Sequence, residues 1–136
     1  PYQFGDSWGC SNSHFSSPSP YRAFPITLGE PITIASISDG TSNTLMIGED
    51  LPAFNYHAAL YYANGDYCSC HGPLNFKPNP PDPSNWPNAM TFRSQHAKGA
   101  NFCLADASVR FVQQTISITT YQALCTRAMG EVATLP

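Results

Sequence analysis

The sequence has little charge. Only 11% of its 136 residues are Asp, Glu, Lys or Arg, against about 25% in an average soluble domain. The six basic residues are scattered and the formal net charge is −3, so the chain offers no positive patch of the kind that binds nucleic acid. We expect no nucleic-acid partner.

Long hydrophobic runs are also missing. No apolar run approaches the roughly eighteen residues of a transmembrane helix, so we expect no membrane span in this chain. No internal repeat, signal peptide or prepilin leader is visible. The length is sufficient for one domain with its own core, and residues 1–136 are predicted to form a single globular domain.

Proline, glycine and cysteine are plentiful by comparison, with 13 Pro, 9 Gly and 5 Cys. Together with many Ser, Asn, Thr and Tyr residues they indicate a loop-rich, neutral polar surface. Such a surface is typical of secreted and surface-layer proteins. We therefore expect an extracellular, cell-surface or periplasmic location.

Period-two alternation predicts a β-hairpin near the C-terminus. Phe102 and Leu104 alternate with more polar neighbours before Asp106-Ala107, where Asp favours a turn, and Val109 and Phe111 alternate beyond it. Two further strands are expected upstream: a short one around Ile32 and Ile34, and a central one at residues 45–49.

A short helix is predicted after the hairpin. Its apolar face contains Ile118, Tyr121, Leu124, Cys125 and Ala128 at helical spacing. Ser117 or Thr119 would cap its start, with Arg127 in the last turn and Gly130 beyond it. The predicted fold class is α+β: an antiparallel sheet with a C-terminal hairpin, then one short helix, with long loops rich in Pro, Gly and Tyr.

A His and an Asp that face each other across a hairpin suggest acid–base chemistry. His96 and Asp106, with Ser94 or Ser108 as nucleophile, would outline a hydrolase. However, the sequence contains no nucleophile elbow and no oxyanion loop. We therefore interpret Arg93, His96 and Asp106 as residues that hold a loop and a turn in place, and expect no catalytic residue and no enzyme activity.

Two groups of residues could bind a metal ion. Oxygen ligands for Ca²⁺ would come from Asp39, Asn43, Glu49 and Asp106, although the turn at Asp39 has few carboxylates and its side chains more readily bond its own backbone. Thiolate and imidazole ligands for Zn²⁺ would come from Cys68-Ser69-Cys70-His71, with Cys10 or His57. The single residue between the cysteines is shorter than usual for zinc, and disulfides or free thiols are favoured. No other cofactor is expected.

The odd number of cysteines predicts one or two disulfides and a leftover thiol. Cys10 paired with Cys68 or Cys70 is the preferred bridge, because all three lie in predicted loops. Cys103 and Cys125 would then be small buried apolar residues.

His96, nine intervening residues and Asp106 resemble the C-terminal His-x9-Asp-Gly signature of planctomycete DUF1559 proteins. Gly99 and Arg93 lie in the same motif. Three other segments agree, and they are residues 37–49, 72–78 and 121–131 without Cys125. One departure is Ala107, where the family has Gly.

The resemblance implies a pseudopilin-like protein with a pilin-like globular head. A prepilin-type leader and a hydrophobic helix would precede this C-terminal part in a longer precursor. Its function would be structural, as a subunit of a pilus-like filament, secretion apparatus or surface layer of the bacterial envelope, with other protein subunits as partners in homo- or hetero-oligomers. Pseudopilins that hold Ca²⁺ in C-terminal loops lend the calcium hypothesis some support. The alternative is a secreted accessory or binding module that docks onto a larger protein or glycan complex through aromatic loops.

Overall fold

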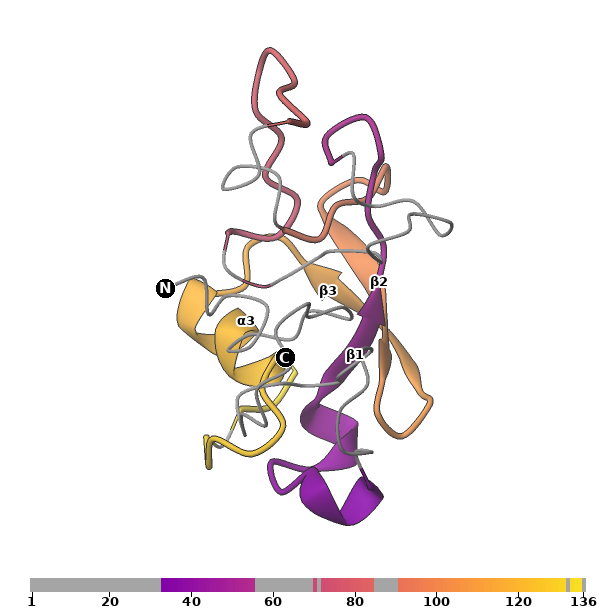
Figure 1. Ribbon diagram of the computed structural model, residues 1–136, viewed down its shortest axis with the longest axis vertical. Helices are drawn as coiled ribbons and strands as arrows, with labels where there is room; N and C mark the ends of the chain where they lie inside the picture. The colour runs from indigo at the N-terminus through magenta and orange to yellow at the C-terminus, as the bar shows by residue number, and fades with distance from the viewer. Residues whose placement is uncertain (1–32, 56–69, 71, 85–90, 132, 136) are drawn as a thin grey trace.

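The computed structural model describes residues 33–55, 70, 72–84, 91–131 and 133–135. Its elements are, in chain order, η1 (Ile34–Ser36), η2 (Thr41–Asn43), β1 (Leu45–Gly48), β2 (Gly99–Leu104), β3 (Val109–Gln113) and α3 (Ile118–Leu124). Figure 1 shows α3 beside a small twisted sheet, with the irregular segment before β2 at the top of the view. The predicted α+β class is confirmed. Among the described residues no helix is long and apolar enough to cross a membrane.

The sheet has the order β1-β2-β3 and is antiparallel throughout. The prediction that residues 45–49 form the central strand is wrong, because β2 lies between its two partners. The hairpin β2–β3 forms locally and leaves only one edge of β2 free for the distant β1. A shift in register between Leu45 and Ile47 marks a bulge in β1.

The core fills the space between one face of the sheet and α3. Phe102 on β2 lies at its centre, with edge-to-face contacts to Phe92 and Tyr121 at ring-centroid distances of 5.1 and 6.2 Å. Such aromatic pairs contribute about 1 kcal/mol each beyond the area they bury. Other buried members are Leu45, Cys70, Leu74, Ala100, Leu104, Val112, Leu124 and Cys125.

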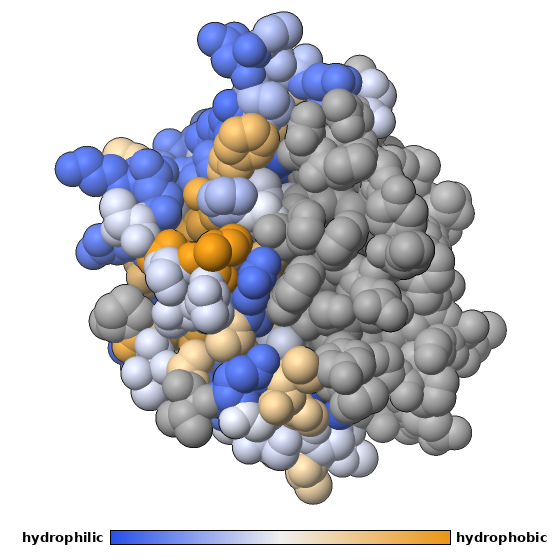
Figure 2. Space-filling view, turned by 90° about the vertical axis from the view of Figure 1, so that its left-hand side faces the viewer, coloured by the Kyte–Doolittle hydropathy of each residue, from blue (hydrophilic) through white to orange (hydrophobic). Residues whose placement is uncertain are grey.

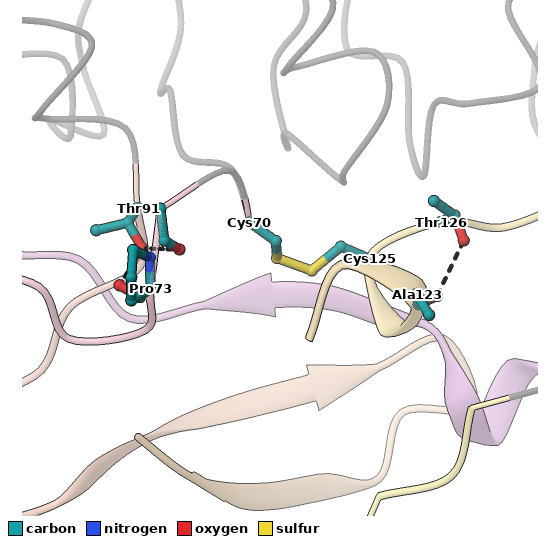
Figure 3. The surroundings of a disulfide bond; sticks show 7 residues. Cys70, Pro73, Thr91, Ala123, Cys125 and Thr126 are labelled. Atoms are coloured by element: carbon teal, nitrogen blue, oxygen red, sulfur yellow. Dashed lines mark hydrogen bonds between the residues drawn. A yellow bond between two sulfur atoms is a disulfide. The ribbon is translucent and has the colours of Figure 1, made fainter. Parts of the chain in front are cut away.

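The helix α3 begins where the sequence predicts and ends early. Ser117 is the N-cap, and its side chain accepts a hydrogen bond of 3.0 Å from the Thr120 N–H. The expected continuation to Ala128 is wrong: Cys125 leaves helical geometry, with ψ near 0°, and the Thr126 hydroxyl donates to the Ala123 carbonyl at 2.9 Å (Figure 3). The Ala123 carbonyl at the helix end thus accepts from this hydroxyl as well as from the Thr126 N–H at 3.4 Å.

A disulfide between Cys70 and Cys125 ties the end of α3 to the segment before β2 (Figure 3). This corrects two predictions, since Cys70 is not bonded to Cys10 and Cys125 is not a free thiol. A bridge between Cys10 and Cys68 stays a prediction, because both lie outside the described residues. The cross-link spans 55 residues, and in the chain-entropy description a loop of that length stabilises the fold by about 4 kcal/mol.

The short strand expected around Ile32 and Ile34 is replaced by the single turn η1, and Ile32 lies outside the described residues. The Ser36 N–H and hydroxyl both donate to the Thr33 carbonyl, at 2.9 and 2.7 Å. A local side-chain bond of this kind stabilises a turn in competition with extended structure. Ile34 consequently points into solvent.

The hairpin turns through a three-residue loop rather than a two-residue one. The Ala107 N–H donates to the Leu104 carbonyl at 2.9 Å and the Leu104 N–H donates to the Ser108 carbonyl at 2.8 Å. This is a type I turn followed by a bulge residue in the left-handed region. That residue is Ala107, with φ of 67°, where Gly is the favoured occupant.

We expect Ala107→Gly to stabilise the protein by about 1 kcal/mol, because it removes the cost of holding a Cβ at positive φ. The melting temperature should rise by about 4 °C. Ala105→Gly is the matched control: Ala105 has no positive φ, so glycine there should destabilise slightly through unfolded-state entropy. Equal effects of the two substitutions would contradict this account of the turn.

Candidate functional site

The His and Asp of the signature lie at opposite ends of β2. His96 precedes the strand and Asp106 follows it, and the six residues of β2 extend about 20 Å at 3.3 Å per residue. The acid–base pair that would define a hydrolase therefore does not form. Each residue instead takes part in a separate group of contacts.

Arg93 is the centre of the first group. Its side chain is 0% exposed and forms an ion pair with Asp50, itself 6% exposed, at 3.5 Å. The guanidinium also donates to the carbonyls of Phe76 and Thr91, at 2.6 and 3.1 Å. Asp50 accepts from Asn55 at 2.8 Å and from its neighbour's N–H. Because buried charges need both a partner and hydrogen bonds, these contacts lock three chain segments together.

The segment 72–78 is held to the same place through Asn75. This residue adopts a φ of 66°, which Asn tolerates better than most residues. Its side chain accepts from the Ser94 N–H at 2.9 Å, and its own N–H donates to the Phe92 carbonyl at 2.9 Å. The Lys77 ammonium donates to the Ser94 carbonyl at 2.6 Å. Hydrogen bonds thus hold residues 72–78 against residues 91–94.

Glu49 links β1 to the loop that carries His96. Its carboxylate accepts from the Asn101 N–H at 2.7 Å and lies 3.4 Å from His96 Nε2. Partial burial raises the pKa of Glu49. Hydrogen bonds from Asn101 and the Ser94 hydroxyl, together with the nearby His96, lower it by more than burial raises it, so the pKa lies below its ordinary value. Beyond the end of β1 at Gly48, the Glu49 carboxylate thus accepts the Asn101 N–H in place of a backbone carbonyl of a neighbouring strand.

Ser94 is not arranged as a nucleophile. It is buried, its hydroxyl accepts from the His96 backbone N–H at 3.1 Å, and it bonds the Glu49 carboxylate. A Ser–His–acid triad needs the hydroxyl to donate to the imidazole. Here the serine and the imidazole both contact the acid instead.

Asp39 connects the turn before η2 to the chain after α3. Its carboxylate accepts from the N–H groups of Met129 and Gly130, both at 2.9 Å. Its own N–H donates to the Arg127 carbonyl at 3.2 Å, while the Arg127 guanidinium donates to the Ser36 carbonyl at 3.0 Å. Residues 36–39 and 127–130 thereby hold each other in a fixed geometry.

Asp106 stabilises the hairpin turn. Its carboxylate accepts from the Ser108 N–H at 2.9 Å, and hydrogen bonds from Ser108 lower the pKa of Asp106. Backbone bonds from Ala105 and Asp106 to the carbonyls of Thr44 and Thr41 attach the turn to η2.

The proposed calcium ligands are not brought together. Asp39, Glu49 and Asp106 each accept hydrogen bonds from a different part of the protein, and Asn43 sits in η2, where its N–H bonds the Gly40 carbonyl. Within the described ranges, no three His, Cys, Asp or Glu side chains are grouped so that they could hold a metal ion. Zinc binding through Cys70 is excluded by its disulfide; its proposed co-ligands Cys10, His57, Cys68 and His71 lie outside the described residues.

Sequence reasoning missed three residues that matter most to this arrangement: Asp50, Asn75 and Cys125. A signal existed for the first, since two consecutive acids directly after an apolar strand are unusual in so weakly charged a chain. Asn75, in the middle of a turn-rich segment, is a residue type that accepts positive φ. Nothing in the spacing of Cys125 indicates its partner.

Residues 4–119 match the family described as a protein of unknown function, DUF1559. The chain belongs to the DUF1559 family. The resemblance read from its motifs is thereby confirmed, and the contacts of Arg93, His96 and Asp106 described above are contacts within a DUF1559 domain. No curated protein and no solved structure matches the chain.

Gly99 has a steric reason to be glycine in this DUF1559 chain. A Cβ at this position would lie 2.2 Å from the Val112 carbonyl oxygen and 2.7 Å from the Phe111 ring. Neither distance is compatible with a side chain, so Gly99 allows β3 to approach β2 closely at the start of the strand.

The lowered pKa of Glu49 predicts an acid-sensitive contribution to stability. An acid whose pKa is depressed by folding stabilises the protein above its unfolded-state pKa, and the contribution is lost as the pH falls through the folded-state value. We therefore expect the stability advantage of the wild type over Glu49→Gln to shrink as the pH drops below about 4.5. Urea unfolding at several pH values between 7 and 3 measures it, and a difference that stays constant with pH would disprove it.

Proposed function

We propose that this DUF1559 domain is a non-enzymatic assembly protein of the bacterial envelope. It would serve as the pseudopilin-like head of a subunit in a pilus-like filament, secretion apparatus or surface layer. The observation that carries the proposal is that side chains of the segments resembling DUF1559 bond other parts of the same domain. Arg93 and Asp39 form their hydrogen bonds inside the domain, as expected of a scaffold and not of a reaction centre.

The disulfide and the composition support an extracytoplasmic location. Disulfides persist in oxidising compartments and are rare in the cytosol, and the Cys70–Cys125 bridge joins two parts of the core. A surface with few charges and many neutral polar groups suits a protein that packs against other subunits, because little charge must be desolvated on contact.

The alternative is a secreted accessory module that binds a protein or glycan through aromatic loops. The residues that would form such a surface are Tyr2, Trp8, Tyr21, Tyr56, Tyr61, Tyr62, Tyr67 and Trp86, all of which lie outside the described residues. The alternative therefore rests on composition alone and ranks second.

Fractionation of the native cell tests the proposal. The full-length gene product, tagged at its C-terminus, is followed in the cytoplasm, the envelope, the mechanically sheared material and the medium, with thiols alkylated at lysis. We expect the protein in the envelope or sheared fraction in high-mass assemblies, with Cys70 and Cys125 protected from alkylation. A Cys70→Ser/Cys125→Ser double variant calibrates the loss of protection.

Two other results would decide against the proposal. A reduced, cytoplasmic protein would overturn both the location and the assembly role. A monomer released into the medium would replace the assembly role with that of the secreted module.

A further inference from the structure

The edge strand β3 has one side without a partner among the described residues. It pairs with β2, and within the part of the chain that the structure describes the sheet order β1-β2-β3 places no strand beyond it. An open edge presents a row of backbone donors and acceptors that can pair with another strand.

The register identifies the outward groups. In an antiparallel ladder, residues that exchange hydrogen bonds alternate with residues that do not. The bonds from Leu104 N–H to the Ser108 carbonyl and from Gln114 N–H to the Lys98 carbonyl, both 2.8 Å, fix the phase of this alternation. Arg110 and Val112 therefore bond β2, and the N–H and C=O groups of Val109, Phe111 and Gln113 point away from it.

Of the usual devices that prevent pairing, this edge carries a single charge, Arg110. Its sequence Val109–Gln113 contains no Pro or Lys, and its register with β2 runs without a bulge. The side chains of Val109 and Phe111 are 66% and 48% exposed. An exposed edge strand with apolar side chains favours pairing with another strand.

We propose that β3 pairs antiparallel with β3 of a second copy of this chain, about a two-fold axis at Phe111. This register sets Phe111 opposite its own copy and Val109 opposite Gln113 of the other chain. Every outward group then meets an outward group, which gives about six hydrogen bonds. The two sheets join into one continuous sheet across the interface.

Side chains suit this pairing on both faces of the strand. The two Phe111 rings would meet as a cross-strand aromatic pair, which is favourable. Arg110, the strand's one charge, would lie opposite Val112 of the other copy, so the two arginines would be diagonal neighbours about 7–8 Å apart and not directly opposed. A cavity of about 500 Å³ lies between β3, the start of α3, and Thr134 and Leu135 near the C-terminus, and offers room for a side chain from the second copy.

The pairing rests on the proposed assembly role only in identifying the partner subunit as a second copy of this chain. The observations that support it concern β3 alone. Its failure would leave the envelope location and the assembly role to the fractionation test above. Conversely, a self-pairing protein found in the cytoplasm would refute the proposed function and keep the pairing.

Sedimentation equilibrium of the purified chain between 1 and 500 μM tests the proposal. We expect a reversible monomer–dimer equilibrium that Phe111→Lys weakens at least about tenfold, because two like charges then meet at the axis. Ile47→Lys is the matched control: it adds the same charge at an exposed position on β1 and should change the dissociation constant less than about twofold. A chain that stays monomeric, or a dimer indifferent to Phe111→Lys, would overturn the proposal.

Oxidative cross-linking checks the register without depending on the folding of the lysine variant. In a Cys103→Ser background, Phe111→Cys should form a disulfide-linked dimer. The Cα atoms of a hydrogen-bonded antiparallel pair lie about 5.5 Å apart, which is within the Cα–Cα range of disulfides. Gln113→Cys should not, since its counterpart would be four residues away along the strand. Cross-linking at residue 113 and not at residue 111 would rule out this register.

Discussion

The structure depends on one buried cation. Arg93 is removed from water entirely, and its guanidinium is stabilised there by the charge of Asp50 and by the carbonyls of Phe76 and Thr91, which accept hydrogen bonds. Each of these partners comes from a different stretch of a chain with little regular structure. A buried charge that must be satisfied from several sides thus fixes loops that hydrophobic packing alone would leave free to vary.

Other residues of the segments that resemble DUF1559 connect further parts of the chain around Arg93. Asn75 and Lys77 attach one loop to Ser94, Glu49 attaches β1 to Asn101 and His96, and Asp39 attaches the turn before η2 to Met129 and Gly130. The Cys70–Cys125 bridge adds a covalent tie between the core and the end of α3. The residues whose pattern resembles DUF1559 proteins form, in this chain, a set of structural contacts around a small sheet.

Local patterns predicted the local elements well. The hairpin, the cap at Ser117 and the α+β class follow from alternation, helical spacing and turn chemistry, all of which act over a few residues. Contacts between distant segments were not predictable in this way. The central position of β2, the pairing of Asp50 with Arg93 and the partner of Cys125 depend on how the chain folds back, and no short-range pattern encodes them. The His96–Asp106 pairing failed for the same reason, because spacing in sequence was read as proximity across a hairpin.

The stability of Asp50→Asn tests the central role of the buried ion pair most directly. The substitution keeps the shape of the side chain and removes the charge that compensates Arg93, so the free energy of unfolding should fall by roughly 3 kcal/mol. Asp82→Asn, in which the side-chain contact is a bond from the Ser84 hydroxyl, should change it by less than about 0.5 kcal/mol. Urea unfolding at neutral pH gives both values. Equal, small losses in the two variants would contradict the view that Arg93 and Asp50 hold this domain together.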